Sequence, residues 1–251
     1  MTIRDFSSQR LFIGADLPAT GAIDLDRDQT HYLVTVLRQK PGDRVLVFNG
    51  RDGEWAGVIA SADRKSARLT LTHQTRPQVG GPDITYLFAP LKRARLDYMV
   101  QKATELGVAR LCPVLTRFTQ AERVNLERMR ANMIEAAEQC GILRLPEVLE
   151  PVRLEVALAR LGTDVLLVFC DEAAETSDPI KALQQAAGSR QAPSPVAVLI
   201  GPEGGFSADE RELLLRRSPV VRLSLGPRIM RADTAAVAAL ALVNATLADW
   251  C

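Results

Sequence analysis

The sequence predicts an α/β protein with a β-rich N-terminal part, residues 1–75, and a larger part, residues 76–251. In the first part, short apolar runs alternate with turn signals such as Asn49-Gly50 and Asp52-Gly53. In the second part, fully apolar runs alternate with segments of helical periodicity. That alternation is typical of a parallel sheet covered by helices on its faces.

The N-terminal part is expected to form a small barrel of short strands around one helix. Strands are predicted at residues 10–13, 44–48, 54–60 and 67–72. The helix is predicted over His31–Arg38, with Thr30 as its N-cap and Pro41-Gly42 at its end. Residues 74–82 hold two prolines and two glycines and little apolar matter, so we interpret them as a linker.

The second part is expected to alternate strands with helices. Strands are predicted at residues 84–89, 111–115, 165–170, 196–200 and 220–225. Helices are predicted at residues 97–106, 125–140, 179–187, 208–217 and 234–247. The last helix is apolar nearly all round, so it is expected to lie inside the chain or at a subunit interface.

Composition excludes several classes of protein. The net charge of +1 does not indicate a polyanion partner, so any nucleic-acid site must come from local clusters of Arg and Lys. The cysteines Cys112, Cys140, Cys170 and Cys251 form no CxxC pair and there are two histidines, so no metal site is expected. The N-terminus lacks a signal-peptide core and no apolar run could span a membrane, which predicts a cytoplasmic protein.

Two glycine-bearing turns carry the chemistry of the second part. Gly201–Phe206 follows one predicted strand and Gly226–Ala235 follows the next, at the strand ends where α/β proteins bind ligands. Glycine allows the main chain to approach a ligand closely. Neither turn matches the dinucleotide or P-loop pattern, which suits a nucleotide-like ligand without phosphate, such as S-adenosylmethionine. Ser207 and Glu210 predict a capping box at the next helix.

Several segments in order resemble the RsmE family, the uridine-N3 methyltransferases of 16S ribosomal RNA, which belong to the SPOUT superfamily. The segments are GPEGGF at Gly201–Phe206, LSLGPRIMRADTA at Leu223–Ala235, KATELGV at Lys102–Val108, EAAEQCGILRLP at Glu135–Pro146 and HYLVTVLRQKPGD at His31–Asp43. The resemblance implies a PUA-like RNA-binding barrel over residues 1–75 and a SPOUT methyltransferase domain over residues 76–251. It also implies a C-terminal trefoil knot at roughly residues 165–251 and a homodimer.

The resemblance further implies S-adenosylmethionine as methyl donor, and a donor site on three segments of this chain. The implied donor-binding residues are Leu167, Phe169, Cys170, Ile200, Gly201, Pro202, Glu203, Gly204, Leu223, Ser224, Leu225, Gly226, Ile229, Met230 and Thr234.

Methylation of N3 of uridine requires loss or stabilisation of its proton, which makes Arg231 the first candidate for a catalytic group. Arg231 could instead form a structural ion pair with Asp233 or Glu203, and Glu203 is a second catalytic candidate, as a base. RNA contacts are expected from two clusters of basic residues and one further arginine: Arg10, Arg38, Lys40, Lys92, Arg93, Arg95 and Arg117. Ile142 stands where the family commonly has an arginine, so a contact of that arginine with RNA or with the other subunit is missing here or is shared with Arg144.

Two other functions stay open at this point. One is a SPOUT methyltransferase acting on another ribosomal or transfer RNA position. The other is a non-catalytic RNA-binding ribosome-assembly protein that has kept the fold.

Overall fold

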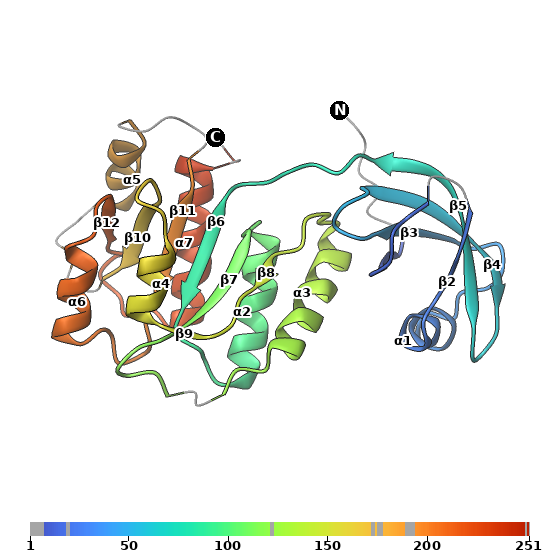
Figure 1. Ribbon diagram of the computed structural model, residues 1–251, viewed down its shortest axis with the longest axis horizontal. Coiled ribbons are helices and arrows are strands. Elements are labelled where there is room, and N and C mark those ends of the chain that lie inside the picture. The colour runs from blue at the N-terminus through green and yellow to red at the C-terminus, as the bar shows by residue number, and fades with distance from the viewer. Residues whose placement is uncertain are drawn as a thin grey trace. The chain divides into compact units, whose positions relative to one another are not determined.

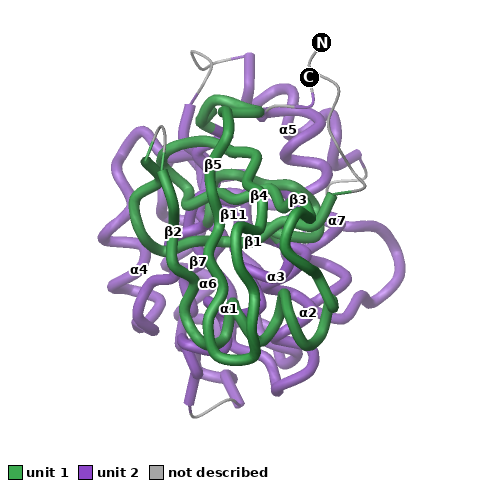
Figure 2. Tube along the Cα trace, turned by 90° about the vertical axis from the view of Figure 1, so that its right-hand side faces the viewer, with its two compact units in different colours: residues 1–80, 137–145 green, residues 81–136, 146–251 purple. Residues whose placement is uncertain are grey.

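The computed structural model describes residues 8–18, 21–120, 123–171, 174, 178–188, 194–248 and 250. The chain forms two compact units (Figure 2). The first unit contains Met1–Gly80 together with Ala137–Leu145, and the second contains Gly81–Ala136 and Pro146–Cys251. Cys251, one of the cysteines expected to be a scattered thiol, lies outside the described residues.

The first unit is built on a mixed sheet of five strands in the order β1-β3-β4-β5-β2 (Figure 1). Strand β1 runs parallel to β3, and the other neighbours are antiparallel. The strands are β1 (Arg10–Phe12), β2 (Gly21–Asp24), β3 (Arg44–Phe48), β4 (Glu54–Ala62) and β5 (Ala67–Arg76).

Two predictions for this unit need correction. Strand β5 extends to Arg76, into the predicted linker, because Thr75 and Arg76 both bond the buried carboxylate of Glu54. The short strand β2 was not predicted, since four residues with a single buried side chain, Ile23, give too little alternation to recognise.

The helical segment of the first unit begins earlier than predicted. Asp26, and not Thr30, is the N-cap, in a capping box with Gln29 that starts α1 (Arg27–Thr30). Thr30 already has helical backbone angles and continues into η1 (His31–Val36), a segment with π-helical hydrogen bonds. The predicted cap was wrong because Asp26 offers the stronger local cap one turn upstream.

Residues 137–145 complete the first unit. Ala137 and Leu143 pack with Phe48 in one apolar cluster, and Ile142 lies against it. The backbone N–H of Phe12 donates to the Glu138 carboxylate at 2.8 Å. This return of the chain to the first sheet is not indicated by any pattern in the sequence.

The second unit is built on a parallel sheet of seven strands (Figure 1). Its main path has the order β12-β10-β11-β6-β7-β8, and β9 pairs with β7. The strands are β6 (Ile84–Phe88), β7 (Arg110–Leu115), β8 (Glu147–Val148), β9 (Val152–Arg153), β10 (Leu166–Cys170), β11 (Val196–Ile200) and β12 (Val220–Leu223).

Helices cover both faces of this sheet. They are α2 (Arg93–Glu105), α3 (Leu126–Cys140), α4 (Leu154–Arg160), α5 (Pro179–Gly188), α6 (Ala208–Leu215) and α7 (Ala232–Leu247). Helix α2 begins four residues before its predicted start at Asp97, because the polar residues of its first turn give no apolar signal. The short elements β8, β9 and α4 were not predicted either, because segments this short show no periodic pattern.

Alternate residues of each strand serve the two faces. Leu167 and Leu199 belong to a core shared with Leu154 of α4 and Leu214 of α6. On the other face, the Tyr86 hydroxyl donates to the Met99 sulfur of α2 at 3.1 Å. Helix α7 contacts β11, α2 and α5.

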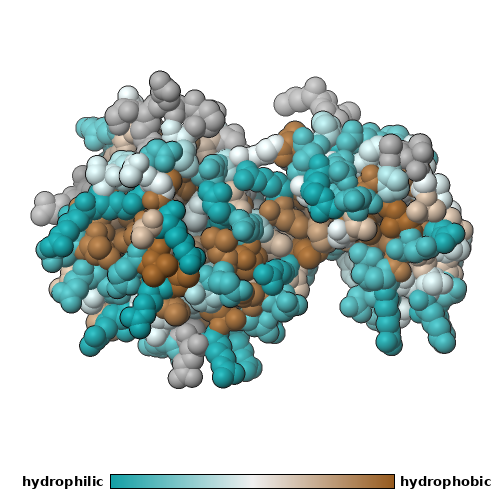
Figure 3. Space-filling view, in the orientation of Figure 1, coloured by the Kyte–Doolittle hydropathy of each residue, from teal (hydrophilic) through white to brown (hydrophobic). Residues whose placement is uncertain are grey.

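On the face of the second unit visible in Figure 3, apolar residues gather in patches bordered by hydrophilic residues. Within the described residues, no helix has the length and apolar character that crossing a membrane requires.

Candidate functional site

A cavity of about 1300 Å³ lies at the C-terminal ends of β10, β11 and β12, neighbours in the parallel sheet. Both glycine turns line it. Its walls are Arg95, Cys170, Asp171, Ile200, Gly201, Pro202, Glu203, Gly205, Phe206, Arg211, Leu223, Ser224, Leu225, Gly226, Pro227, Arg228, Ile229, Met230, Arg231, Ala232 and Ala235. We call it the strand-end cavity.

Two glycines shape the cavity walls for different reasons. A Cβ on Gly201 would lie 2.9 Å from the Phe206 ring, so a side chain there would displace that ring. Phe206 in turn contacts Phe169 edge to face, with the ring centroids 6.3 Å apart. Gly226 has φ +101°, a conformation that other residues rarely adopt. At its glycine, each turn thus brings bare main chain to the cavity wall.

Most of the residues expected at a donor site line this cavity. Leu167 and Phe169 instead point into the sheet core and are fully buried. Gly204 and Thr234 lie beside the lining residues without belonging to them. Six further lining residues belong to the two glycine turns but were not among the expected donor contacts: Gly205, Phe206, Pro227, Arg228, Ala232 and Ala235. Asp171 and Arg211 also line the cavity, and no sequence pattern indicated them.

Asp171 carries the main electrostatic feature of the cavity wall. Its Oδ2 accepts from Arg211 at 3.0 Å and from Arg222 at 2.9 Å, while the residue is only 9% exposed. The cavity lining contains four arginines and two acidic residues, Asp171 and Glu203. The carboxylates can face a cationic ligand, and the arginines give the rim a positive field suited to phosphate.

Cys170 also reaches the cavity, and burial raises the pKa of its thiol to about 12. The thiol is therefore protonated and a poor nucleophile at neutral pH. Among the residues that the structure describes, no group of three or more His, Cys, Asp or Glu side chains could hold a metal ion.

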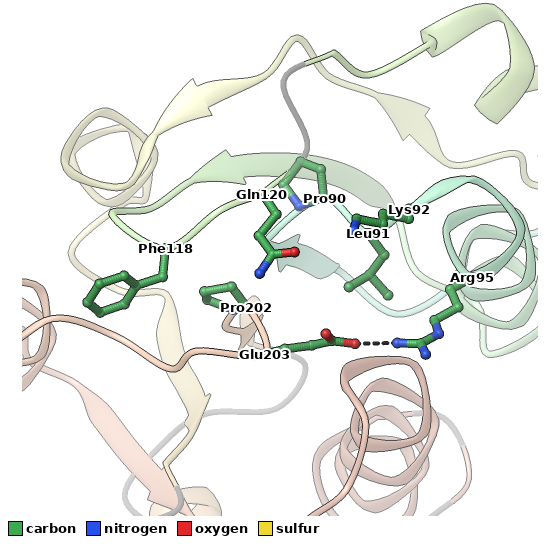
Figure 4. A pocket seen from close by; sticks show the side chains of 8 residues that line it. All are labelled: Pro90, Leu91, Lys92, Arg95, Phe118, Gln120, Pro202 and Glu203. Atoms are coloured by element: carbon green, nitrogen blue, oxygen red, sulfur yellow. Dashed lines mark hydrogen bonds and ion pairs between the residues drawn. The ribbon is translucent and has the colours of Figure 1, made fainter.

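A smaller cavity of about 250 Å³ adjoins the first (Figure 4). It is lined by Pro90, Leu91, Lys92, Arg95, Phe118, Gln120, Pro202 and Glu203. Arg95, Pro202 and Glu203 line both cavities. The Arg95 guanidinium and the Glu203 carboxylate form an ion pair on this shared wall. We call the smaller cavity the side cavity.

The loop after β7 forms one wall of the side cavity and is held firmly. The Arg117 N–H donates to the Glu210 carboxylate of α6 at 2.7 Å, and the Thr116 N–H donates to the Thr119 hydroxyl at 2.8 Å. The capping box predicted at Ser207 and Glu210 is confirmed. Glu210 therefore serves both the helix start and the neighbouring loop.

Arg231 is exposed, lines the strand-end cavity and is the N-cap residue of α7. Glu203, one of its two considered ion-pair partners, is bonded to Arg95 instead. The ion pairs found among the described residues do not include Arg231. Its guanidinium is thus available to a ligand in the cavity.

The residues expected to contact RNA fall into different environments. Arg10 is 6% exposed and bonds the buried Glu54 at 3.0 Å, so its guanidinium does not reach the surface. Arg38, with φ 55°, and Lys40 are exposed on the first unit. The rest belong to the second unit, where Lys92, Arg93 and Arg117 are exposed and Arg95 is partly buried.

Comparison with known proteins identifies this architecture. Residues 80–244 match the family model of an RNA methyltransferase domain, and residues 25–72 match that of an RNA methyltransferase PUA domain. The parallel-sheet unit is therefore an RNA methyltransferase domain. The chain belongs to the RsmE family, as the resemblance of its loops predicted.

Curated relatives cover nearly the whole chain. The ribosomal RNA small subunit methyltransferase E of Rickettsia conorii is 32% identical over 94% of this chain and 94% of its own length. The enzyme of that name from Synechocystis is 30% identical over 95% of this chain and 78% of its own length.

Two solved structures share the fold. One is ribosomal RNA small subunit methyltransferase E of Neisseria gonorrhoeae, bound to S-adenosylmethionine, which superposes with a TM-score of 0.85 at 23% identity. The superposition covers 97% of this chain and 100% of that chain. The Legionella pneumophila methyltransferase Lpg2936, in complex with S-adenosylmethionine, gives a TM-score of 0.82 at 27% identity, covering 96% and 99%.

Proposed function

We propose that this protein transfers a methyl group from S-adenosylmethionine to N3 of a specific uridine in the 16S ribosomal RNA of the small subunit. The observation that carries the proposal is the strand-end cavity, in which both glycine turns meet. Relatives that cover nearly the whole chain are named for methylation of small-subunit ribosomal RNA. Similar folds have been solved with S-adenosylmethionine bound.

The cavity fits this methyl donor. Gly201 and Gly226 have no side chain to cover their main-chain N–H and C=O groups. A Cβ at Gly201 would displace the Phe206 ring from the cavity wall. The carboxylates of Asp171 and Glu203 balance part of the arginine charge and face a cationic ligand favourably. When bound, S-adenosylmethionine supplies a methyl group already activated on a sulfonium, so the reaction needs no metal.

We assign the donor contacts to the lining residues expected from the resemblance. They are Cys170, Ile200, Gly201, Pro202, Glu203, Leu223, Ser224, Leu225, Gly226, Ile229 and Met230. Leu167, Phe169, Gly204 and Thr234 support these contacts from behind, through the sheet core and the flanks of the turns.

The protein's own catalytic task is to bring a weakly nucleophilic N3 to the methyl group and to stabilise the charge that forms as its proton leaves. Arg231 is suited to stabilise this developing charge, because it lines the cavity and has no ion-pair partner among the described residues. Glu203 is the candidate for accepting the proton, since it lies on the wall shared with the side cavity.

We assign RNA binding to a PUA-like barrel over residues 1–75 and to the SPOUT methyltransferase domain over residues 76–251. Exposed basic residues on each unit support it: Arg38, Lys40, Lys92, Arg93 and Arg117. Arg10 is left out because it is buried against Glu54. A trefoil knot at roughly residues 165–251 is supported by the placement of β12 beside β10 while α7 contacts β11.

We further infer that the protein acts as a homodimer in the cytoplasm, where small ribosomal subunits are found. Helix α7 supports a subunit interface, because its apolar residues Val237, Ala241 and Leu242 are only partly buried. Sedimentation at several concentrations would test the dimer, and a monomer at assay concentration would refute it.

The function is tested by methyl transfer from labelled S-adenosylmethionine to small subunits lacking the modification, beside naked 16S ribosomal RNA. Nucleoside mass spectrometry should find N3-methyluridine. Arg231→Ala should lower kcat by about 100-fold and leave donor binding, measured by calorimetry, nearly unchanged. Arg130→Ala, on an exposed arginine of α3, is the control. Methylation of another RNA or position, or no donor binding, would overturn the proposal.

A further inference from the structure

We propose that the side cavity binds the target base as a flipped-out uracil, and that Gln120 and Arg95 recognise its carbonyl oxygens. This inference rests on the proposed function, which supplies the reaction but does not say where the base lies. Enzymes that modify a base commonly draw it out of the RNA into a pocket. The structure offers such a pocket directly beside the strand-end cavity.

The position of the side cavity is the first argument. Arg95, Pro202 and Glu203 line both cavities, so a ligand in one touches the wall of the other. A methyl donor and a base in these two spaces would meet at that wall. With about 250 Å³, the side cavity suits one base, because pockets for larger ligands start at about 300 Å³.

The composition of the walls is the second argument. Pro90, Leu91, Phe118 and Pro202 form apolar surfaces, which suit the flat faces of a base. In Figure 4 the Gln120 side chain points into the space between Leu91 and Pro202. Few polar groups on an apolar lining are typical of a site that fixes the orientation of one ligand.

The hydrogen-bonding groups match uracil in particular. Its edge presents two carbonyl acceptors, O2 and O4, on either side of N3–H. The Gln120 amide and the Arg95 guanidinium supply donors for the carbonyl oxygens, and the Glu203 carboxylate can accept from N3–H. Cytosine would present an amino donor in place of O4 and leave one protein donor unmatched beneath the bound base, which is costly.

In the free protein, the Gln120 and Arg95 donors are available to a ligand in the side cavity. No described residue forms a hydrogen bond with the Gln120 amide. The Arg95 guanidinium pairs with Glu203 through only part of its N–H groups and retains further N–H donors for a ligand. Phe118 is 46% exposed and packs against the backbone of Gly204, where a Cβ would lie 3.3 Å from it. The anchor at Glu210 fixes the loop that carries both Phe118 and Gln120.

The arrangement gives the proton a path. Glu203 takes the N3 proton, the N3 electron pair forms the new bond to the methyl carbon, and the C–S bonding pair stays on sulfur. Arg95 stabilises the negative charge that the carbonyl oxygens gain as the proton leaves. This makes Arg95 a second group beside Arg231 that acts on the reacting base.

The test compares Gln120→Ala with Gln184→Ala, a change at an exposed glutamine of α5 outside both cavities. The substrate is small subunits lacking the modification. Gln120→Ala should lower kcat/KM for the subunits by about tenfold or more, with the Kd for S-adenosylmethionine within about twofold of wild type. Gln120→Glu, which places a carboxylate beside the carbonyl oxygens, should lower it further.

Arg95 gives a second readout, the pH dependence of methyl transfer. Arg95→Ala should shift the rise of the pH–rate profile to higher pH, because the N3 anion loses its stabilising cation. Arg95→Lys should restore part of the shift. Arg216→Ala, at the exposed C-cap arginine of α6 that pairs with Glu212, is the control and should leave the profile in place.

The outcomes separate this inference from the proposed function. If the wild type methylates the uridine but Gln120→Ala keeps full kcat/KM, the base lies elsewhere and the inference is wrong. If Gln120→Ala weakens donor binding as strongly as methylation, the side cavity belongs to the donor site and the inference is also wrong. If the wild type does not methylate the subunits at all, the proposed function itself fails.

Discussion

The backbone N–H of Arg117 donates to the carboxylate of Glu210 at 2.7 Å, across 93 residues of sequence. The other oxygen of the same carboxylate accepts from the Ser207 N–H at 2.8 Å, at the start of α6. One buried glutamate thus links the glycine turn Gly201–Phe206, which precedes α6, to the loop after β7. Both cavities depend on this link, because Phe118 directly follows Arg117 and Pro202 lies in the turn that leads to Ser207.

Replacing Glu210 by alanine should therefore loosen the loop as well as the helix start. Both backbone donors would be left unpaired, so the free energy of unfolding should fall by about 2 kcal/mol or more. Urea titration followed by circular dichroism would measure the loss. Asp209→Ala, at the exposed neighbour in the same turn, should cost about 0.5 kcal/mol. Equal effects of the two changes would contradict the role given to Glu210.

The buried carboxylate of Glu54 should make the first unit sensitive to acid. Burial acts to raise the pKa of Glu54, but hydrogen bonds from Arg76, Thr75 and Arg10 outweigh it and hold the pKa below its ordinary value of 4.5. A lowered pKa in the folded state gives stability that is present above pH 4.5 and is lost as the pH falls further.

Glu54→Gln should abolish most of that dependence and destabilise the unit by about 3 kcal/mol, since two arginines lose their counter-charge. Trp55 fluorescence reports on this unit, because the indole packs against its core. Asp24→Asn, which breaks the exposed pair with Arg68, should cost less than about 1 kcal/mol. A Glu54→Gln variant as stable as the wild type would show that the cluster contributes little.

Gly201→Ala should damage the donor site through the Phe206 ring. The added methyl would lie 2.9 Å from that ring, so the ring must move into the cavity or into Phe169. We expect the Kd for S-adenosylmethionine to rise by about tenfold or more, in line with the 1–3 kcal/mol typical of overpacking. Calorimetry would measure it. Gly188→Ala meets no atom within 4 Å and should bind the donor normally.

Asp171→Asn should weaken donor binding through charge. The substitution leaves Arg211 and Arg222 without their carboxylate and makes the cavity wall more positive toward a sulfonium ligand. The Kd should rise by about tenfold at low salt, and the difference should shrink as salt screens it. Glu212→Gln, at an exposed carboxylate of α6, provides the control. A loss that does not depend on salt would indicate a steric cause instead.

The parallel sheet was the most predictable part of the fold. Strands β10 and β11 are continuous apolar runs bounded by turn residues, and the structure places them within one residue of the prediction. The capping box at Ser207 was predictable because its whole signal lies within four residues. Local patterns of this kind survive folding since the tertiary structure reinforces them.

The polar clusters were not predictable, because their members come from distant parts of the chain. Asp171, Arg211 and Arg222 belong to a strand end, a helix and another strand, and no spacing along the sequence joins them. The side cavity likewise brings Gln120 next to Pro202. Only the order of strands in the sheet decides these encounters, and that order is not readable from hydrophobic periodicity.

The return of residues 137–145 to the first unit has a consequence for synthesis on the ribosome. The first sheet is complete once Arg76 has emerged, but Phe48, which is fully buried in the finished protein, still lacks the cover of Ala137 and Leu143. The nascent N-terminal unit must therefore wait for more than sixty further residues before it closes, counting from Arg76 to residue 145. A translated fragment ending at Gly80 would expose the aromatic surface around Phe48, which chaperones recognise. Because the first unit is made of two separate segments of the chain, neither unit can be exchanged between proteins as one continuous segment.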